Sequence, residues 1–511
     1  MVELEMNNKR KPVGVFLFYG FLFIYFAGLI FLCRELNVSV DEIFSLNTTS
    51  GGLSGAIKLA YNSEGQPPVY FALLSLWRYI NSDILFTRLF SVLFIVLSAY
   101  IFYRLIRLIS KPDYIGWLML VFLLNPFTIW AATEIRLYAF LLFLSLTSLF
   151  FFFRFYLEGK NRYLFFFVLI GIVGIFTQYL YVFLFFALGF ALLLFKGWKT
   201  FFKFCLISLP AAALFLVNYL STSDPMKYAQ VNSLSTTLSE RFSTVLHSPQ
   251  NLILVMNQVP FGRALRLVIT GIFIVLAVYA YLKWYKERKT TRQPSFEVMN
   301  VVLMSSFSLV ALFSIFFSFT AVDYHEKYIA SAFPFLILVV LLFEIFPPVT
   351  AKVIFGAIAL FYVSVLFSIY RYPVKDYDNR SLAKYITSIE DKGEPIFFYQ
   401  KTLSLPFKIY YTGNNPVVPI PDDVAFDSTY FSKIKDTVEL RRSIERIKTD
   451  SPTILLITDR NEAAFKENED VKILNTYLAE HYNVALDTFY HGQGKKNYSL
   501  RVRRLEKKEK N

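Results

Sequence analysis

Long apolar stretches alternate with short polar ones over the first 370 residues of the chain. A helix that crosses a membrane needs about 20 mostly apolar residues, and about eleven stretches reach or approach that length. They cover residues 13 to 33, 86 to 107, 114 to 132, 137 to 157, 162 to 177, 179 to 195, 201 to 220, 264 to 283, 299 to 320, 328 to 346 and 350 to 370. The pattern predicts an α-helical polytopic membrane protein.

Basic residues mark every second loop between these stretches. Lysine and arginine cluster before the first stretch and after the second, fourth, sixth and eighth. Cytoplasmic loops carry such an excess, so we expect a cytoplasmic N-terminus. An odd number of spans then places everything after residue 370 outside. The first stretch is too long for a secretory signal and lacks a small-residue cleavage site, so we interpret it as a membrane anchor.

Three polar segments interrupt the membrane pattern. An outer loop at 34–85 contains a twelve-residue apolar run at 69–80 that follows Pro67 and Pro68, and we expect an interfacial or re-entrant helix there. A second outer loop at 221–262 is a candidate lid over the site. After the membrane domain at 1–370, residues 371–511 have the composition of a small extracytoplasmic α/β domain. Its expected strands are 395–399, 453–458 and 498–502, and its helices 380–390, 432–448 and 460–481.

Composition agrees with the membrane assignment. Hydrophobic residues make up 55% of the chain, with 57 Phe and 33 Tyr among 511 residues, which excludes an ordinary soluble enzyme. The net charge of +14 lies largely in cytoplasmic loops, where it sets topology and contacts anionic lipids. No nucleic-acid-binding module is recognisable. The two cysteines, Cys33 and Cys205, fall at opposite membrane faces and are too far apart for a disulfide.

Polar and titratable residues gather at the outer ends of the spans. Charged groups at a membrane face are costly unless they have a function, and the predicted topology brings this set to one side. Its members are Asp41, Glu42, Glu64, Arg88, Glu134, Arg136, Tyr138, Gln178, Tyr179, Asp323, His325, Glu326 and Lys327. The co-occurrence predicts an active site at the outer face.

Each member also has a purely structural interpretation. Arg88 and Lys327 suit cationic anchors at span ends, and Tyr138 and Tyr179 suit the aromatic belt. Glu134 and Arg136 can pair with each other. His325 suits a hydrogen-bonded surface residue better than a metal ligand. The sequence leaves these alternatives open.

Several of these motifs, in this order, resemble the GT-C glycosyltransferases. The motifs are Asp41-Glu42, Pro67-Pro68-Val69-Tyr70, Arg88-Leu89, Glu134-Ile135-Arg136-Leu137-Tyr138, Thr177-Gln178-Tyr179, and Lys327-Tyr328 with Pro334. The most similar branch contains the protein O-mannosyltransferases and the lipid A aminoarabinose transferase. The resemblance covers about 13 to 400 and is firmest over the first 180 residues.

The resemblance implies transfer of a hexosyl or pentosyl group from a polyprenyl-phosphate donor at the outer face of a bacterial cytoplasmic membrane. Asp41 would be the base for the acceptor hydroxyl in an inverting displacement. Arg88, Arg136 and Lys327 would stabilise the leaving phosphate. The acceptor, a lipid, a protein or a glycan, stays open, as does the donor sugar. Glu42, Glu64, Gln66, Glu134, Tyr138, Gln178, Tyr179, His325 and Tyr328 complete the expected substrate site.

Three positions depart from the family's pattern. Gln66 stands where relatives have His or Lys, Gln178 replaces a His, and Lys327 replaces an Arg. Glutamine neither ligates a transition metal as imidazole does nor carries a charge to a phosphate. A divalent metal is therefore the less favoured option.

Two other function classes fit a polytopic protein with interfacial charges. A transporter or lipid flippase is the main alternative, although no internal repeat, no charge within a span and no broken-helix pair is recognisable. An envelope scaffold with a degenerate site is the other. Replacement of Asp41 separates an enzyme from a scaffold.

Overall fold

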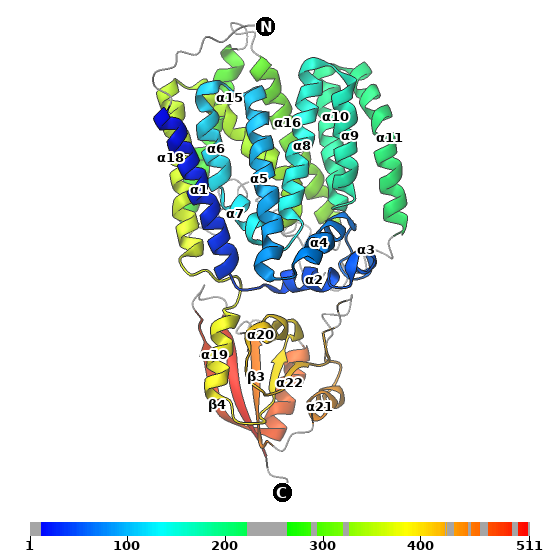
Figure 1. The fold of residues 1–511 in the computed structure, drawn as a ribbon, viewed down its shortest axis with the longest axis vertical. Coiled ribbons are helices and arrows are strands. Elements are labelled where there is room, and N and C mark those ends of the chain that lie inside the picture. Colours follow the sequence, from blue (N-terminus) through cyan, green and yellow to red (C-terminus); the bar gives the residue numbers. More distant parts are fainter. Residues whose placement is uncertain are drawn as a thin grey trace.

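A helical bundle and a smaller α/β domain are stacked end to end (Figure 1). The structure is a computed structural model that describes residues 12–221, 263–287, 294–319, 326–424, 426, 434–447, 451–459, 469–492 and 499–508. The loop 222–262, expected as a lid, lies outside the described residues. We call the end of the bundle that faces the α/β domain the domain-facing end.

The bundle contains the apolar stretches that the sequence indicates. Its long helices are α1 (Pro12–Glu35), α5 (Ile84–Ile109), α8 (Tyr138–Glu158), α9 (Asn161–Ile175), α10 (Val182–Lys196), α11 (Trp198–Ser221), α15 (Arg263–Glu287), α16 (Pro294–Phe319) and α18 (Pro348–Tyr370). Among the described residues, 8 helices are long and apolar enough to cross a membrane, or up to 10 if each of two bent pairs is one span. The chain is a polytopic α-helical membrane protein.

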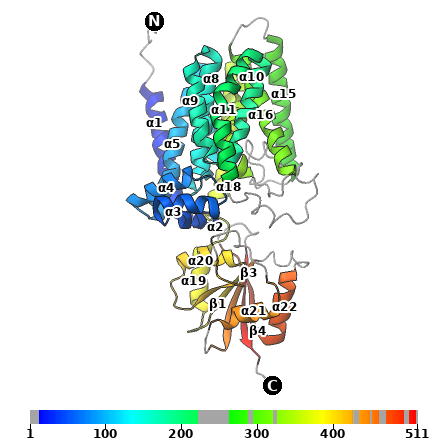
Figure 2. The ribbon, with the colours of Figure 1, turned by 90° about the vertical axis from the view of Figure 1, so that its right-hand side faces the viewer.

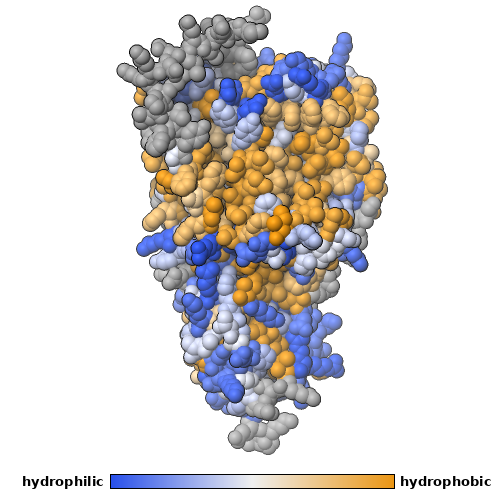
Figure 3. Space-filling model, in the orientation of Figure 1, coloured by the Kyte–Doolittle hydropathy of each residue, from blue (hydrophilic) through white to orange (hydrophobic). Residues whose placement is uncertain are grey.

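On the face shown in Figure 3, a belt of hydrophobic side chains crosses the bundle, with hydrophilic residues at its ends. Phe23, Leu206, Val275 and Leu360 belong to this exposed apolar surface. Apolar area on this scale is costly in water and is covered by lipid tails in a membrane. The belt therefore marks the height of the bilayer.

The span expected at 114–132 is not one helix. It divides into α6 (Ile115–Leu124) and α7 (Pro126–Thr133), which meet at an angle of 51°. Pro126 has no N–H to continue the α6 ladder, and the Asn125 side chain accepts a hydrogen bond from the backbone N–H of Phe127 at 2.8 Å. The prediction of a continuous helix was wrong because the sequence Asn-Pro both ends one helix and begins the next.

The stretch expected at 328–346 is also irregular. It consists of the 3-10 helix η3 (Glu326–Ala332), the short helix α17 (Phe333–Leu338) and a second 3-10 helix, η4 (Val339–Ile345). The segment is largely buried inside the bundle, so neighbouring helices rather than lipid surround its irregular backbone. This segment places Lys327 at the domain-facing end.

Three short helices cap the domain-facing end of the bundle (Figure 2). They are α2 (Val40–Thr48), α3 (Gly52–Asn62) and α4 (Val69–Ile80), and α4 matches the interfacial helix expected at 69–80. The axis of α2 turns by 88° from that of α1. The turn is fixed by a capping box, in which Ser39 Oγ accepts from the Glu42 N–H and Glu42 accepts from the Ser39 N–H.

The C-terminal domain is a three-layer α/β unit. Its mixed sheet has the order β2-β1-β3-β5-β4, in which β2, β1 and β3 are parallel and β5 is antiparallel to both neighbours. The strands are β1 (Ile396–Tyr399), β2 (Val417–Ile420), β3 (Thr453–Asp459), β4 (Tyr482–Tyr490) and β5 (Leu500–Lys507). Helices α19 (Asn379–Ile389) and α20 (Ser404–Tyr410) cover one face, and α21 (Thr437–Glu445) and α22 (Glu469–His481) the other.

The predicted α/β class of this domain is confirmed. The three expected strands and the three expected helices are present, although β2 and β4 were not expected from the sequence. In β4, only Tyr482 is buried, and apolar residues do not alternate with polar ones along its sequence, which explains why its pattern carries little signal. Both cysteines are unpaired, as predicted.

Candidate active site at the domain-facing end

Asp41 and Glu42 point in different directions from α2. Successive residues of a helix lie about 100° apart, so a helix that rests on the bundle buries one and leaves the other accessible. The Glu42 side chain is completely buried, whereas that of Asp41 is 46% exposed. The two carboxylates therefore have different roles.

Arg88 holds Glu42 from the first turns of α5. Arg88 Nε lies 2.9 Å from Glu42 Oε1 and Nη2 lies 2.8 Å from Oε2. The other guanidinium N–H groups donate to the carbonyls of Cys33, Leu36 and Asn37 at 2.7 to 2.9 Å. All five guanidinium donors are thus engaged, and the residue is 1% exposed.

This arrangement does not favour the roles expected for Arg88 and Glu42. A guanidinium without a free donor, buried behind α2, is not placed to bind a leaving phosphate. Glu42 is likewise not available to an acceptor or a cation. Both residues instead fix the corner between α1 and α2, and so the backbone that carries Asp41.

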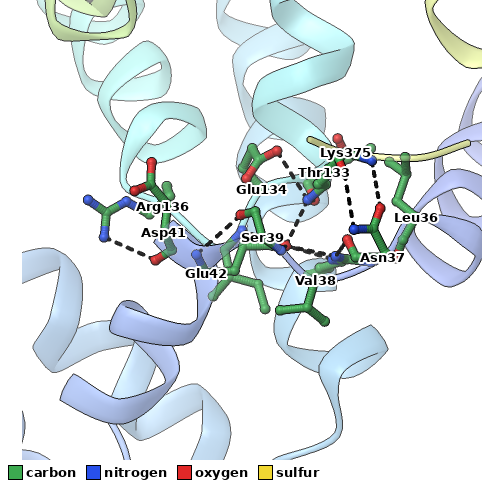
Figure 4. Close-up of polar contacts among 12 residues, drawn as sticks. Leu36, Asn37, Val38, Ser39, Asp41, Glu42, Thr133, Glu134, Arg136 and Lys375 are labelled. Carbon is green, nitrogen blue, oxygen red and sulfur yellow. Dashed lines mark hydrogen bonds and ion pairs between the residues drawn. The ribbon is translucent and has the colours of Figure 1, made fainter. Parts of the chain in front are cut away.

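Lys375 completes this buried cluster from the linker between α18 and α19 (Figure 4). Its Nζ lies 2.9 Å from Glu42 Oε2 and 3.1 Å from Glu134 Oε1, and it donates to the Thr133 carbonyl at 2.9 Å. Burial opposes ionisation of both carboxyls, but Lys375 and Arg88 outweigh it at Glu42 and lower its pKa. At Glu134 burial prevails and raises the pKa to about 7.

A pair between Glu134 and Arg136 was one structural alternative left open by the sequence, and the structure contradicts it. Glu134 faces Lys375, whereas Arg136, two residues later, turns to the outer side of α2. Its Nη1 lies 2.9 Å from Glu64 Oε2, 3.0 Å from Ser45 Oγ and 3.3 Å from the Asp41 carbonyl oxygen. Arg136 therefore ties α2 to the loop before α4.

Lys327 pairs with the Asp41 carboxylate. Its Nζ lies 2.5 Å from Asp41 Oδ2, and its side chain is 25% exposed. The Tyr138 phenol at the start of α8 is also close enough to interact electrostatically with Lys327 and Asp41. The structure thus joins Asp41, Arg136, Tyr138 and Lys327, which come from three segments distant in sequence.

Gln66 and Gln178 lie on two segments that meet beside this group. The backbone N–H of Val69 donates to the Phe176 carbonyl at 3.1 Å, which joins the start of α4 to the end of α9. The Oε1 atoms of Gln66 and Gln178 are buried and have no hydrogen-bond partner among the described residues. Buried amide oxygens of this kind suit a ligand with hydroxyl groups.

The remaining expected residues are less central. Tyr179 packs its ring edge against Phe215 and Tyr219 of α11, as an aromatic-belt residue does. Tyr328 stacks on Phe317 with ring centroids 6.2 Å apart. His325 lies outside the described residues. Within the part of the chain that is described, no cluster of three His, Cys, Asp or Glu side chains suits a metal ion.

Sequence reasoning missed Lys375 and Asn37. The Asn37 side chain accepts from the Lys375 N–H at 2.6 Å and donates to the carbonyls of Lys375 and Tyr377 at 3.1 and 2.9 Å. Both residues stand in short polar segments next to spans, where many residues have no special role. No periodicity or motif distinguishes them.

Comparison with known proteins rests on structure alone. No protein-family model matches the chain, and no curated protein matches it by sequence. ArnT from Cupriavidus metallidurans is similar in the apo state, with 13% sequence identity and a TM-score of 0.51. The same protein bound to undecaprenyl phosphate gives a TM-score of 0.52 at 13% identity. Each alignment covers 95% of this chain and 98% of ArnT. The chain has the fold of the GT-C glycosyltransferases, as the resemblance in its motifs predicted.

Proposed function

We propose that the protein is a membrane glycosyltransferase that moves a sugar from a polyprenyl-phosphate donor to an acceptor at the outer face of the cytoplasmic membrane. The observation that carries the proposal is the half-exposed Asp41 carboxylate with Lys327 at 2.5 Å and Arg136 beside it. This is one accessible carboxylate and one partly exposed ammonium at the edge of an apolar belt. Such a pair suits a reaction in which a proton and a phosphate must both be accepted.

The chemistry assigns a separate role to each charge. As the acceptor oxygen attacks the anomeric carbon, the sugar–phosphate bond breaks and the bonding pair leaves with the phosphate. Asp41 takes the hydroxyl proton. Lys327 stabilises the charge that develops on the phosphate. Because displacement occurs from the face opposite the leaving group, the anomeric configuration inverts.

Lys327 pairs first with the Asp41 carboxylate and then with the donor phosphate. Without a donor it neutralises Asp41. A donor phosphate competes for the same ammonium, and the contact with Asp41 weakens as the contact with phosphate forms. The carboxylate is then released toward the acceptor hydroxyl. Donor binding thereby prepares the base.

The fold supports a polyprenyl-phosphate donor rather than a soluble nucleotide sugar. ArnT, with which this chain shares its fold, has been seen bound to undecaprenyl phosphate. The apolar belt next to Asp41 and Lys327 suits a donor whose tail stays in the bilayer while its phosphate reaches the interface. We place the domain-facing end outside the cell on the distribution of basic loops.

Replacement of Asp41 by Asn tests the proposed base. In nanodiscs, D41N should still bind the polyprenyl-phosphate donor, but its rate of sugar transfer should fall at least about 100-fold. The matched control is Asp113→Asn, because Asp113 is an exposed carboxylate in the short helix before α6 and far along the chain from the site. An Asp41→Asn variant that retains transfer contradicts the assignment. Donor translocation without acceptor would favour the flippase alternative.

A further inference from the structure

The linker at residues 371–378 joins the bundle to the α/β domain and is fastened at the corner between α1 and α2. Lys375 extends from it to Glu42 and Glu134, and Asn37 binds its backbone through three hydrogen bonds. Asp376 follows with a φ of 38°, which non-glycine residues adopt rarely. The backbone bends sharply at this point. We call Asn37 and Lys375 the latch.

The latch continues into the α/β domain. The Tyr377 hydroxyl donates to Asp459 Oδ2 at 2.6 Å, at the end of β3. The Val38 N–H donates to the Tyr410 hydroxyl of α20 at 2.9 Å. A movement of the domain therefore acts on the backbone that flanks Asn37.

The latch also continues toward Asp41. Glu42 is the next residue of α2, and its carboxylate takes charge-assisted hydrogen bonds from Lys375 and Arg88. Because the Glu42 side chain is fully buried, α2 cannot rotate without breaking these bonds. The rotation of α2 decides where the Asp41 side chain points.

We propose that Lys375 is a positioning residue that couples the placement of the α/β domain to the placement of Asp41. The role of Asp41 rests on the proposed function, whereas the mechanical coupling does not. A lysine suits the task because its three ammonium protons meet three acceptors, Glu42, Glu134 and the Thr133 carbonyl. Together with Arg88 it contacts the buried Glu42 carboxylate, and it alone of the two pairs with Glu134.

Interdomain distance measures the coupling directly. Spin labels attached at positions 50 and 480, where Ser50 and Glu480 are exposed, report the separation of the two domains. Cys205 is replaced by Ser so that this free cysteine is not labelled as well. The Lys375→Met variant lacks the ammonium that binds Glu42 and Glu134, so its distance distribution should be broader than that of the wild type. Asn37→Ala should broaden it as well. The Asn37→Ala variant removes no charged group, so its distance distribution tests the coupling even if K375M does not fold.

The matched control is Lys401→Met. Lys401 is also a buried lysine, 2% exposed, but its ammonium pairs with Asp422 inside the α/β domain. Its removal should leave the interdomain distribution as in the wild type. Wild-type distributions in both K375M and N37A overturn the proposal.

Kinetics separate the inference from the proposed function. In K375M, kcat should fall about 10- to 100-fold because Asp41 is misplaced, while the donor KM changes by less than about twofold. Loss of donor affinity with unchanged kcat contradicts a positioning role. If the wild-type protein transfers no sugar, the proposed function fails, yet the distance measurement still decides the coupling.

Discussion

Asp41 and Glu42 are neighbours in the chain, yet Glu42 is completely buried and Asp41 is nearly half exposed. Glu42 closes the capping box of α2 and binds Arg88 and Lys375, so its carboxylate is used by the fold. Asp41 stands beside Lys327 at the accessible side. One carboxylate thus orients the helix that presents the other.

The buried pair should dominate the stability of the domain-facing end. Arg88→Met leaves Glu42 buried without its main partner, which costs about 3–5 kcal/mol. Thermal unfolding in detergent should show a large loss of midpoint temperature. Arg107→Met at the opposite end of α5 is the control, because Arg107 is exposed and its loss should cost less than about 0.5 kcal/mol. Equal midpoints for both variants contradict this account of the cluster.

Donor affinity should depend on Lys327. Charge-assisted hydrogen bonds contribute about 1.5–3 kcal/mol, so Lys327→Met should weaken binding of a polyprenyl phosphate about 10- to 100-fold. Binding to the protein in nanodiscs measures this. Lys384→Met serves as control because Lys384 is exposed on α19 of the α/β domain. Unchanged affinity in K327M argues against phosphate recognition by this residue.

Stability should depend on pH through Glu134. Its folded pKa is raised from 4.5 to about 7, chiefly by burial. Between these values the unfolded carboxyl ionises while the folded one keeps its proton, so the contribution of Glu134 to stability falls as pH rises. We expect the midpoint temperature of the wild type, relative to Glu134→Gln, to decline from pH 4.5 to 7. A difference that is constant across this range contradicts the raised pKa.

Gly174 should be intolerant of a side chain. A Cβ there would lie 2.4 Å from Cε1 of Tyr181, whose hydroxyl shares a hydrogen bond with Ser148 at 2.9 Å. Gly174→Ala should destabilise the protein by about 1–3 kcal/mol through overpacking. Gly116 in α6 has no atom within 4 Å of its Cβ position, so Gly116→Ala should be neutral or stabilising by less than about 1 kcal/mol. Thermal unfolding measures both variants. A smaller loss of midpoint temperature in G174A than in G116A contradicts the close packing of Tyr181 on Gly174.

The sequence predicted the helices and strands better than the breaks and turns between them. Hydrophobic length located the apolar stretches of the bundle, because a bilayer imposes about the same apolar length on each span. Of the roughly eleven expected spans, 8 to 10 are long and apolar enough among the described residues. Hydrophobic length could not show that Asn125 and Pro126 divide one span or that α2 turns by 88° after α1. Those features depend on caps and on local packing.

The sequence predicted which charged residues would meet better than it predicted their contacts. Charged residues at one end of the spans indicated a candidate site, and Asp41, Arg136 and Lys327 do meet there. Arg88 is an arginine at a span end like any other until its five donors are seen to be engaged. Lys375 follows Glu42 by more than three hundred residues, and only the fold brings them together.

Phosphorus NMR tests the central claim most directly. A polyprenyl phosphate sugar is a phosphodiester, and transfer converts it into the phosphate monoester, which resonates at a different shift. With the purified protein in nanodiscs, a panel of such donors and envelope extract as acceptor, we predict a growing monoester signal from at least one donor that is absent in D41N. Persistence of every phosphodiester with the wild-type protein, or an equal monoester signal with D41N, contradicts the claim.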